Sequence, residues 1–181
     1  MDYRELLRKS VHLLGLSYIP AYEILGRGGM VIAVGTITLF AIILEVLRHR
    51  FGIIPEFLLR NYEKKGVGAY VYFGIATFII TVTLPKNACF VGVVVGSLGD
   101  GVSGILKHAF KLSGLWASLG MLIVSVFGIY ILDLLSIRSL LAVIAGVAVE
   151  RVERIGGYHI NDNLSVPLVS AFAHRALEIV L

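Results

Sequence analysis

The chain contains several long runs of apolar residues that almost lack charge, and these runs constrain its fold more than any other feature. A membrane-spanning helix needs roughly 20 mostly apolar residues to cover about 30 Å of hydrocarbon. Four strong candidates lie at residues 28–47, 67–84, 88–106 and 115–132. Three weaker candidates lie at 12–25, 134–149 and 164–181, which contain Pro20, Arg138 and the group His174, Arg175 and Glu178, respectively. The expected fold is all-α, a multi-pass integral membrane helical bundle with about seven membrane segments.

The composition excludes the other broad classes of protein. Of the 181 residues, 57% are hydrophobic and only 15% are charged, against about 25% charged in an ordinary soluble domain. A disordered chain needs low hydrophobicity, and a disulfide-stapled domain needs more than the single cysteine present here. No linker or repeat is evident, so residues 1–181 form one expected polytopic membrane domain. We attribute the net charge of +4 to topology and contact with lipid phosphates, and we expect no nucleic-acid partner.

The distribution of basic residues predicts the orientation in the membrane, because cytoplasmic loops are enriched in Lys and Arg. If all seven segments cross, twelve of the sixteen basic residues lie on one side, and the other side has only Arg27, Lys86 and Arg138. If segment 12–25 did not cross, the bias would shrink to nine against six. We therefore expect seven crossings and a cytoplasmic N-terminus. No cleavable signal is expected, since the first apolar run lacks a clear small-residue cleavage site.

One apolar segment carries an acidic residue, Asp100, in a stretch rich in glycine and serine. An ionisable group at membrane depth costs several kcal/mol without a partner or water, which makes Asp100 a candidate functional residue. The glycines permit either a broken helix whose freed N–H groups bind an anion, or simply close helix packing. Close packing leaves Asp100 unexplained. The spacing Gly99-x-Gly101-x-x-Gly104 matches the dinucleotide-binding fingerprint. That motif requires a βαβ unit, which a membrane helix does not provide, so we discard this interpretation. The candidate phosphate-binding residues here are Gly99, Gly101, Ser103, Gly104, Lys107 and Lys111.

A second polar cluster precedes the last apolar segment. It begins at Glu150 and Glu153 and ends with Asp162 and Asn163, shortly before Pro167. Carboxylate and amide oxygens suit Mg²⁺, which commonly takes one or two carboxylates and completes its shell with waters and phosphates. A turn-rich loop with an Asn/Asp helix cap explains the same residues equally well.

Two further polar groups lie at segment boundaries. Arg8, Lys9 and His12 form part of a basic cluster near the N-terminus, which is either a positively charged flank or a phosphate clamp, and the flank is favoured. Glu63 precedes two lysines, and residues 45–50 form a similar charged boundary; both are more typical of interfacial ion pairs than of catalysts.

The predicted topology brings these groups to one face of the membrane. With seven crossings, one side of the membrane, the cytoplasmic side, holds Arg8, Lys9, Glu63, Lys107, Lys111, Glu150 and Asp162. Asp100 lies about 10 Å from that face at 1.5 Å per residue. Basic side chains beside carboxylates are what phosphoryl transfer needs, because cations neutralise phosphate charge and a carboxylate orients the attacking hydroxyl. A nucleotide would arrive from the cytoplasm and a hydroxyl acceptor from the lipid.

Four ordered motifs resemble the CTP-dependent polyprenol kinases, the family of dolichol kinase, phytol kinase and the yeast-type diacylglycerol kinase. They span nearly the whole chain: Arg8-Lys9-x-x-His12, the segment from Glu63 to Gly74 with Tyr72-Phe73-Gly74, Gly99-Asp100-Gly101-x-Ser103-Gly104, and Glu150 followed by Asp162-Asn163-Leu164-Ser165-Val166-Pro167-Leu168. The resemblance implies a helical membrane enzyme that moves the γ-phosphate of CTP to an isoprenoid or lipid alcohol. One position departs from the family, because Trp116 stands where a glutamate is typical. Either Glu150 or Glu153 supplies that carboxylate, or the donor or the reaction differs.

The leading hypothesis is a Mg²⁺-dependent lipid-alcohol kinase that uses CTP. Asp100 and Asp162 would hold the metal or orient the acceptor, with Asn163 completing the metal shell and Glu150 as a further catalytic carboxylate. Lys107, Lys111, Arg8 and Lys9 would bind the phosphates. The alternatives are a cytidylyltransferase that makes a CDP-lipid from a lipid phosphate, and a transporter or lipid-binding protein that uses Asp100 as a cation site.

Overall fold

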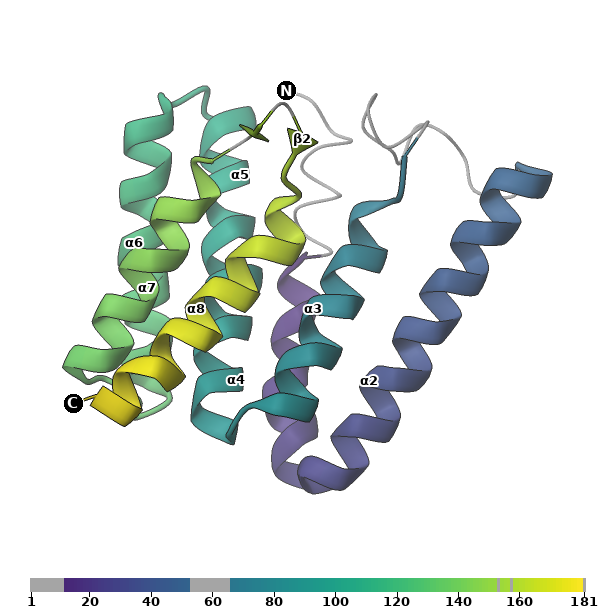
Figure 1. Cartoon of the computed structure of the whole chain (residues 1–181). Coiled ribbons are helices and arrows are strands. Elements are labelled where there is room, and N and C mark those ends of the chain that lie inside the picture. Colours follow the sequence, from purple (N-terminus) through teal and green to yellow (C-terminus); the bar gives the residue numbers. More distant parts are fainter. Residues whose placement is uncertain (1–11, 53–65, 153, 157, 181) are drawn as a thin grey trace.

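The computed structural model describes residues 12–52, 66–152, 154–156 and 158–180, and it is a bundle of helices (Figure 1). A short 3-10 turn η1 (Leu14–Ser17) leads into α2 (Tyr18–Phe51), followed by α3 (Ala69–Thr83). The central stretch comprises α4 (Lys86–Val93), the π-helical segment η3 (Val94–Gly99) and α5 (Asp100–His108). Then come α6 (Gly114–Ile131), α7 (Ile137–Glu150) and α8 (Asp162–Val180). Each helix overlaps a predicted apolar segment, so the all-α prediction is confirmed.

The hairpin before α8 departs from the all-α prediction, whereas the break in α2 agrees with the predicted boundary between segments 12–25 and 28–47. Strands β1 (Arg154–Ile155) and β2 (Tyr158–His159) pair as an antiparallel hairpin in the loop before α8. The helix α2 is interrupted at Gly26, where φ is 64° and ψ is 179°, a conformation that glycine adopts without steric cost. The chain folds back there, so the N-terminal arm and the long C-terminal arm of α2 lie as a hairpin (Figure 1).

The apolar character of the helices agrees with a membrane protein. Among the described residues, three helical stretches are long and apolar enough to span a membrane by length and composition: Leu14–Phe51, Lys86–His108 and Gly114–Ile131. Large apolar side chains such as Ile32 and Phe40 on α2, and Ile123 and Phe127 on α6, are exposed. Exposed apolar surface of this extent is expected where a helix faces lipid.

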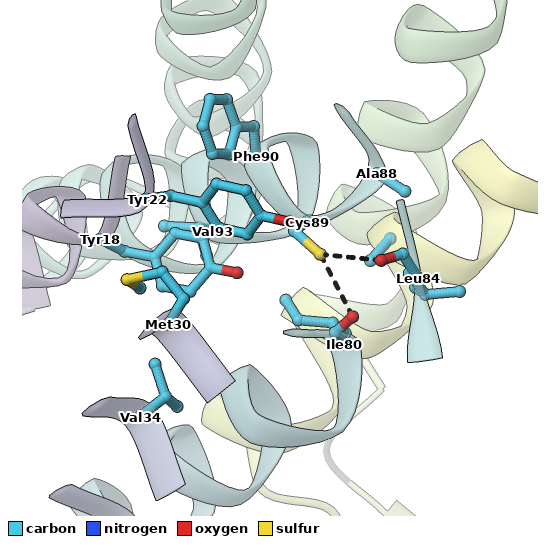
Figure 2. Close-up of a cluster of buried hydrophobic side chains, with 11 residues drawn as sticks. Tyr18, Tyr22, Met30, Val34, Ile80, Leu84, Ala88, Cys89, Phe90 and Val93 are labelled. Atoms are coloured by element: carbon cyan, nitrogen blue, oxygen red, sulfur yellow. Dashed lines mark hydrogen bonds between the residues drawn. The ribbon is translucent and has the colours of Figure 1, made fainter. Parts of the chain in front are cut away.

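The central stretch Lys86–His108 lies between two buried apolar clusters. On one side, Tyr18 and Tyr22 of α2 pack on Phe90, and the rings of Tyr22 and Phe90 meet edge to face at 5.5 Å between centroids. Figure 2 shows this cluster, in which the Cys89 Sγ donates to the carbonyl oxygens of Ile80 and Leu84. On the other side, a second group joins the central stretch to α6, α7 and α8: Val91, Val94, Val95, Met121, Ile129, Val143 and Val166. The segment that carries Asp100 is therefore the core of the bundle.

Close packing of α4 against α8 depends on Gly92. A Cβ added there would lie 2.7 Å from the carbonyl oxygen of Pro167 and 2.8 Å from the Cβ of Ala171. Gly92→Ala is therefore expected to lower the free energy of unfolding by about 1–3 kcal/mol, the usual cost of overpacking. Thermal unfolding of the full chain in detergent measures the effect. Gly28→Ala is the control, because a Cβ there meets no described atom within 4 Å; equal melting temperatures for both variants would contradict the α4–α8 packing.

Candidate functional site

The acidic residue of the central stretch lies at the junction of two helical geometries. Asp100 is the first residue of α5 and follows directly on the π-helical segment η3. A π-helical turn inside an α-helix is rare and is frequent at functional sites. Asp100 is only 2% exposed, so its position in the sequence and its burial agree with the expectation of an intramembrane carboxylate.

Of the two alternatives for the glycine-rich stretch, the broken helix is not present. The chain remains helical from Lys86 to His108, and the residues before and after Gly99 have right-handed helical dihedrals. In a continuous helix the N–H groups are directed along the axis to earlier carbonyls. This geometry does not support the open anion-binding nest, and the phosphate-binding roles of Gly99, Gly101 and Gly104 stay predictions. Two of the glycines instead allow close helix packing. A Cβ added at Gly96 would crowd Pro167, and a Cβ added at Gly99 would crowd Ser125 and Met121.

Asp100 faces His12, which lies just before the 3-10 turn η1. Its Oδ2 lies 3.6 Å from the Nδ1 of His12, and the two side chains are 3% and 10% exposed. The His12 ring in turn lies 6.1 Å from the ring of Phe73 on α3, measured between centroids. Two predicted site residues, 88 positions apart in the sequence, thus form one buried acid–imidazole pair.

A second polar group joins α5 to the end of α7. Ser103 and Lys107 lie one helical turn apart, and both contact the same carboxylate oxygen, Oε1 of Glu150. The Ser103 hydroxyl donates over 3.2 Å, and the Lys107 ammonium forms a short ion pair. The Glu150 side chain is 4% exposed, while Lys107 remains 33% exposed. The second oxygen, Oε2, is buried and has no hydrogen-bond partner among the described residues.

The start of α8 is built as an Asx cap. The Oδ1 of Asn161 accepts from the backbone N–H of Asn163 at 3.0 Å, and the Oδ1 of Asp162 accepts from the same N–H at 2.9 Å. Both oxygens also accept from the Asn163 side-chain amide. This geometry supports the capping alternative for Asp162 and Asn163. The Asn163 Oδ1 is nevertheless buried and without a partner in the described part of the chain.

These groups gather at one end of the bundle. The C-terminal ends of α5 and α7, the N-terminal end of α8 and the two strands lie at the same end (Figure 1). Lys111 lies exposed in the connection from α5 to α6, with a φ of 53°. Trp116 is 59% exposed on the first turn of α6. Its side chain therefore does not fill a buried place in the polar cluster.

Several predicted residues lie outside the described part of the chain: Arg8, Lys9, Glu63 and Glu153. Within the described residues, no group of three or more His, Cys, Asp or Glu side chains is arranged to hold a metal ion. A magnesium site with one or two carboxylates and several waters does not need such a group. The roles predicted for Asp100, Asp162 and Asn163 in metal binding stay predictions.

Residues 45–50 are predicted to form an interfacial ion pair, and the structure has a pair there that is buried instead. Arg48 Nε donates to Glu45 Oε2 at 2.9 Å, and the two residues are 7% and 5% exposed. Glu45 also accepts from the backbone N–H of Gly68 at 2.9 Å and from the hydroxyl of Tyr70. The i, i+3 spacing of Glu45 and Arg48 indicates the pair itself. Its burial depends on α3, which the spacing does not reveal.

No model of a protein family matches the chain, and no curated protein or solved structure matches it with significance.

Proposed function

We propose that the protein transfers the γ-phosphate of CTP to the hydroxyl of a membrane isoprenoid or lipid alcohol in a Mg²⁺-dependent reaction. The observation that carries the proposal is the convergence of Lys107 and Ser103 on one carboxylate oxygen of Glu150, at the end of an apolar bundle. The buried Asp100–His12 pair supports the same assignment. An acidic group, a cation and a hydroxyl beside a lipid phase are what phosphoryl transfer to a lipid alcohol requires.

The proposal includes an orientation in the membrane. We infer that all seven helical segments cross and that the polar end faces the cytoplasm. The basic residues Lys107, Lys111 and Arg151 at the ends of α5 and α7 support this orientation, because Lys and Arg are enriched on the cytoplasmic side. CTP would then approach from water, while the alcohol would enter from the bilayer with its chain in lipid.

Asp100 would accept the proton of the attacking hydroxyl. The acceptor oxygen would form a bond to the γ-phosphorus, the bond from that phosphorus to the β–γ bridging oxygen would break, and CDP would leave. His12 would hold the Asp100 carboxylate in place across its 3.6 Å contact. Lys107, whose charge is offset by Glu150 in the described structure, would place its ammonium beside the phosphates.

The residues present fit a hard cation. Two buried oxygens without a partner among the described residues, Glu150 Oε2 and Asn163 Oδ1, are donors of the type that Mg²⁺ takes. Either Asp100 or Asp162 would join them as a second carboxylate, and waters and nucleotide phosphates would complete the shell. When bound, Mg²⁺ would neutralise charge on the β- and γ-phosphates.

One observation favours a second candidate in the same chemical class. Trp116 occupies the position where the related kinases have a glutamate, and its side chain is exposed. A cytidylyltransferase would use the same nucleotide but join CMP to a lipid phosphate and release pyrophosphate. The acceptor, an alcohol or a phosphate, distinguishes the two reactions.

A product assay tests the proposal. The detergent-purified full chain is incubated with Mg²⁺, a panel of polyprenols, diacylglycerol and phosphatidate, and either CTP or ATP, and the products are identified by mass spectrometry. We expect CDP and a phosphorylated alcohol with CTP. Pyrophosphate with a CDP-lipid would replace the kinase by the cytidylyltransferase. No turnover with any pair would overturn both and favour transport or lipid binding.

A further inference from the structure

A cavity between α2 and α3 is separate from the polar cluster described above. Its volume is about 540 Å³. Four apolar side chains form most of its wall, Ile42 and Val46 from α2 and Val67 and Val71 beside and within α3. His49 and Arg50, in the last turn of α2, also line it. Volumes of this size are typical of sites for small organic ligands.

The surroundings of the cavity are those of a lipid-facing surface. It lies along Leu14–Phe51, one of the stretches apolar enough to span a membrane. Val46 is 58% exposed, and Ile42 and Ile43 beside it are 39% and 47% exposed. Hydrocarbon rather than water is therefore the medium at the apolar part of the cavity.

The charge at the end of the cavity is positive. Glu45 also lines the cavity, and its carboxylate is already engaged by Arg48, by the Gly68 N–H and by Tyr70. Arg50, in contrast, has no ion pair with any described residue. A cation at the end of an apolar groove complements an anionic head group attached to a hydrocarbon chain.

We infer that this cavity binds one anionic phospholipid, with an acyl chain along Ile42, Val46, Val67 and Val71 and the phosphate beside Arg50. The guanidinium of arginine is suited to phosphate oxygens, which it contacts through two parallel N–H groups. The lipid would close the opening between α2 and α3 without taking part in the proposed phosphoryl transfer, so the inference does not rest on that function.

Lipid titration followed by native mass spectrometry tests the inference. The full chain in detergent is titrated with dioleoyl-phosphatidylglycerol, which is anionic, and with dioleoyl-phosphatidylcholine, which is zwitterionic and has the same chains. We expect one phosphatidylglycerol to bind more tightly than the rest. Arg50→Gln should weaken that first binding about five-fold, the factor for one basic residue at an anionic head group. It should weaken phosphatidylcholine binding less, because the choline ammonium offsets the charge of that phosphate.

A second pair of variants separates the cavity from the general lipid-facing surface. Val46→Trp places a large ring at the cavity and should abolish the tight first binding. Ile32→Trp places the same ring on exposed α2 surface away from the cavity, where Ile32 is 72% exposed, and should leave binding unchanged. Equal losses in these two variants, or wild-type binding in Arg50→Gln, would overturn the inference. If Val46→Trp fails to fold, the Arg50→Gln result decides alone.

Discussion

Asp100→Asn is expected to abolish turnover while the protein stays folded. The amide has nearly the same shape as the carboxylate and remains at a position that is 2% exposed, so the packing of α5 is preserved. The loss falls on the proton acceptor for the attacking hydroxyl and on the charge beside His12. Removal of a general base together with a charged group at the reacting centre should reduce the rate by at least about 10²–10⁴-fold. The product assay with CTP measures this loss, and thermal unfolding checks the fold.

Asp133→Asn provides the matched control. Asp133 lies exposed in the turn between α6 and α7, with a φ of 56° that asparagine tolerates well. It undergoes the same chemical change in a turn at the other end of the bundle from Glu150 and the strands (Figure 1), and it should keep full activity. Full activity in Asp100→Asn would remove Asp100 from the site. Equal loss in both variants would point to a general effect of charge or expression.

Glu45→Gln is expected to cause the largest loss of stability of any single substitution considered. The change leaves the Arg48 guanidinium, which is 7% exposed, without its carboxylate partner, and it weakens the bonds from Gly68 and Tyr70. Breaking a buried ion pair by removing one partner typically costs about 3–5 kcal/mol. We expect a clear fall in the melting temperature of the full chain in detergent.

Two controls distinguish a buried ion pair from a general effect of charge. Glu23→Gln removes one partner of the exposed pair with Lys86, whose side chains are 54% and 44% exposed, and should cost less than about 1 kcal/mol. The double variant Glu45→Gln with Arg48→Gln removes both charges together and should recover part of the stability, because no unpaired charge is left. A double variant less stable than the sum of the single changes would contradict the pairing.

Much of the helical architecture could be predicted from local sequence. Apolar runs such as 88–106 and 115–132 correspond to Lys86–His108 and Gly114–Ile131, because a helix satisfies its own backbone groups and needs only a sufficient apolar length. The cost of an intramembrane carboxylate likewise singles out Asp100 from the sequence, and the structure buries that side chain. Both arguments use only residues close together in the chain.

The pairings within the site came from tertiary packing alone. Ser103 and Lys107 meet Glu150 across 47 and 43 positions of sequence, and His12 meets Asp100 across a still longer separation. The glycines at 96–104 were compatible with a broken helix and with close packing, and the contact of Gly96 with Pro167 decided for packing. Periodicity and composition describe the helix itself, whereas the partner of a buried charge depends on which helices lie side by side and in which register. That arrangement is the sum of many weak apolar contacts between distant segments, which no local pattern contains.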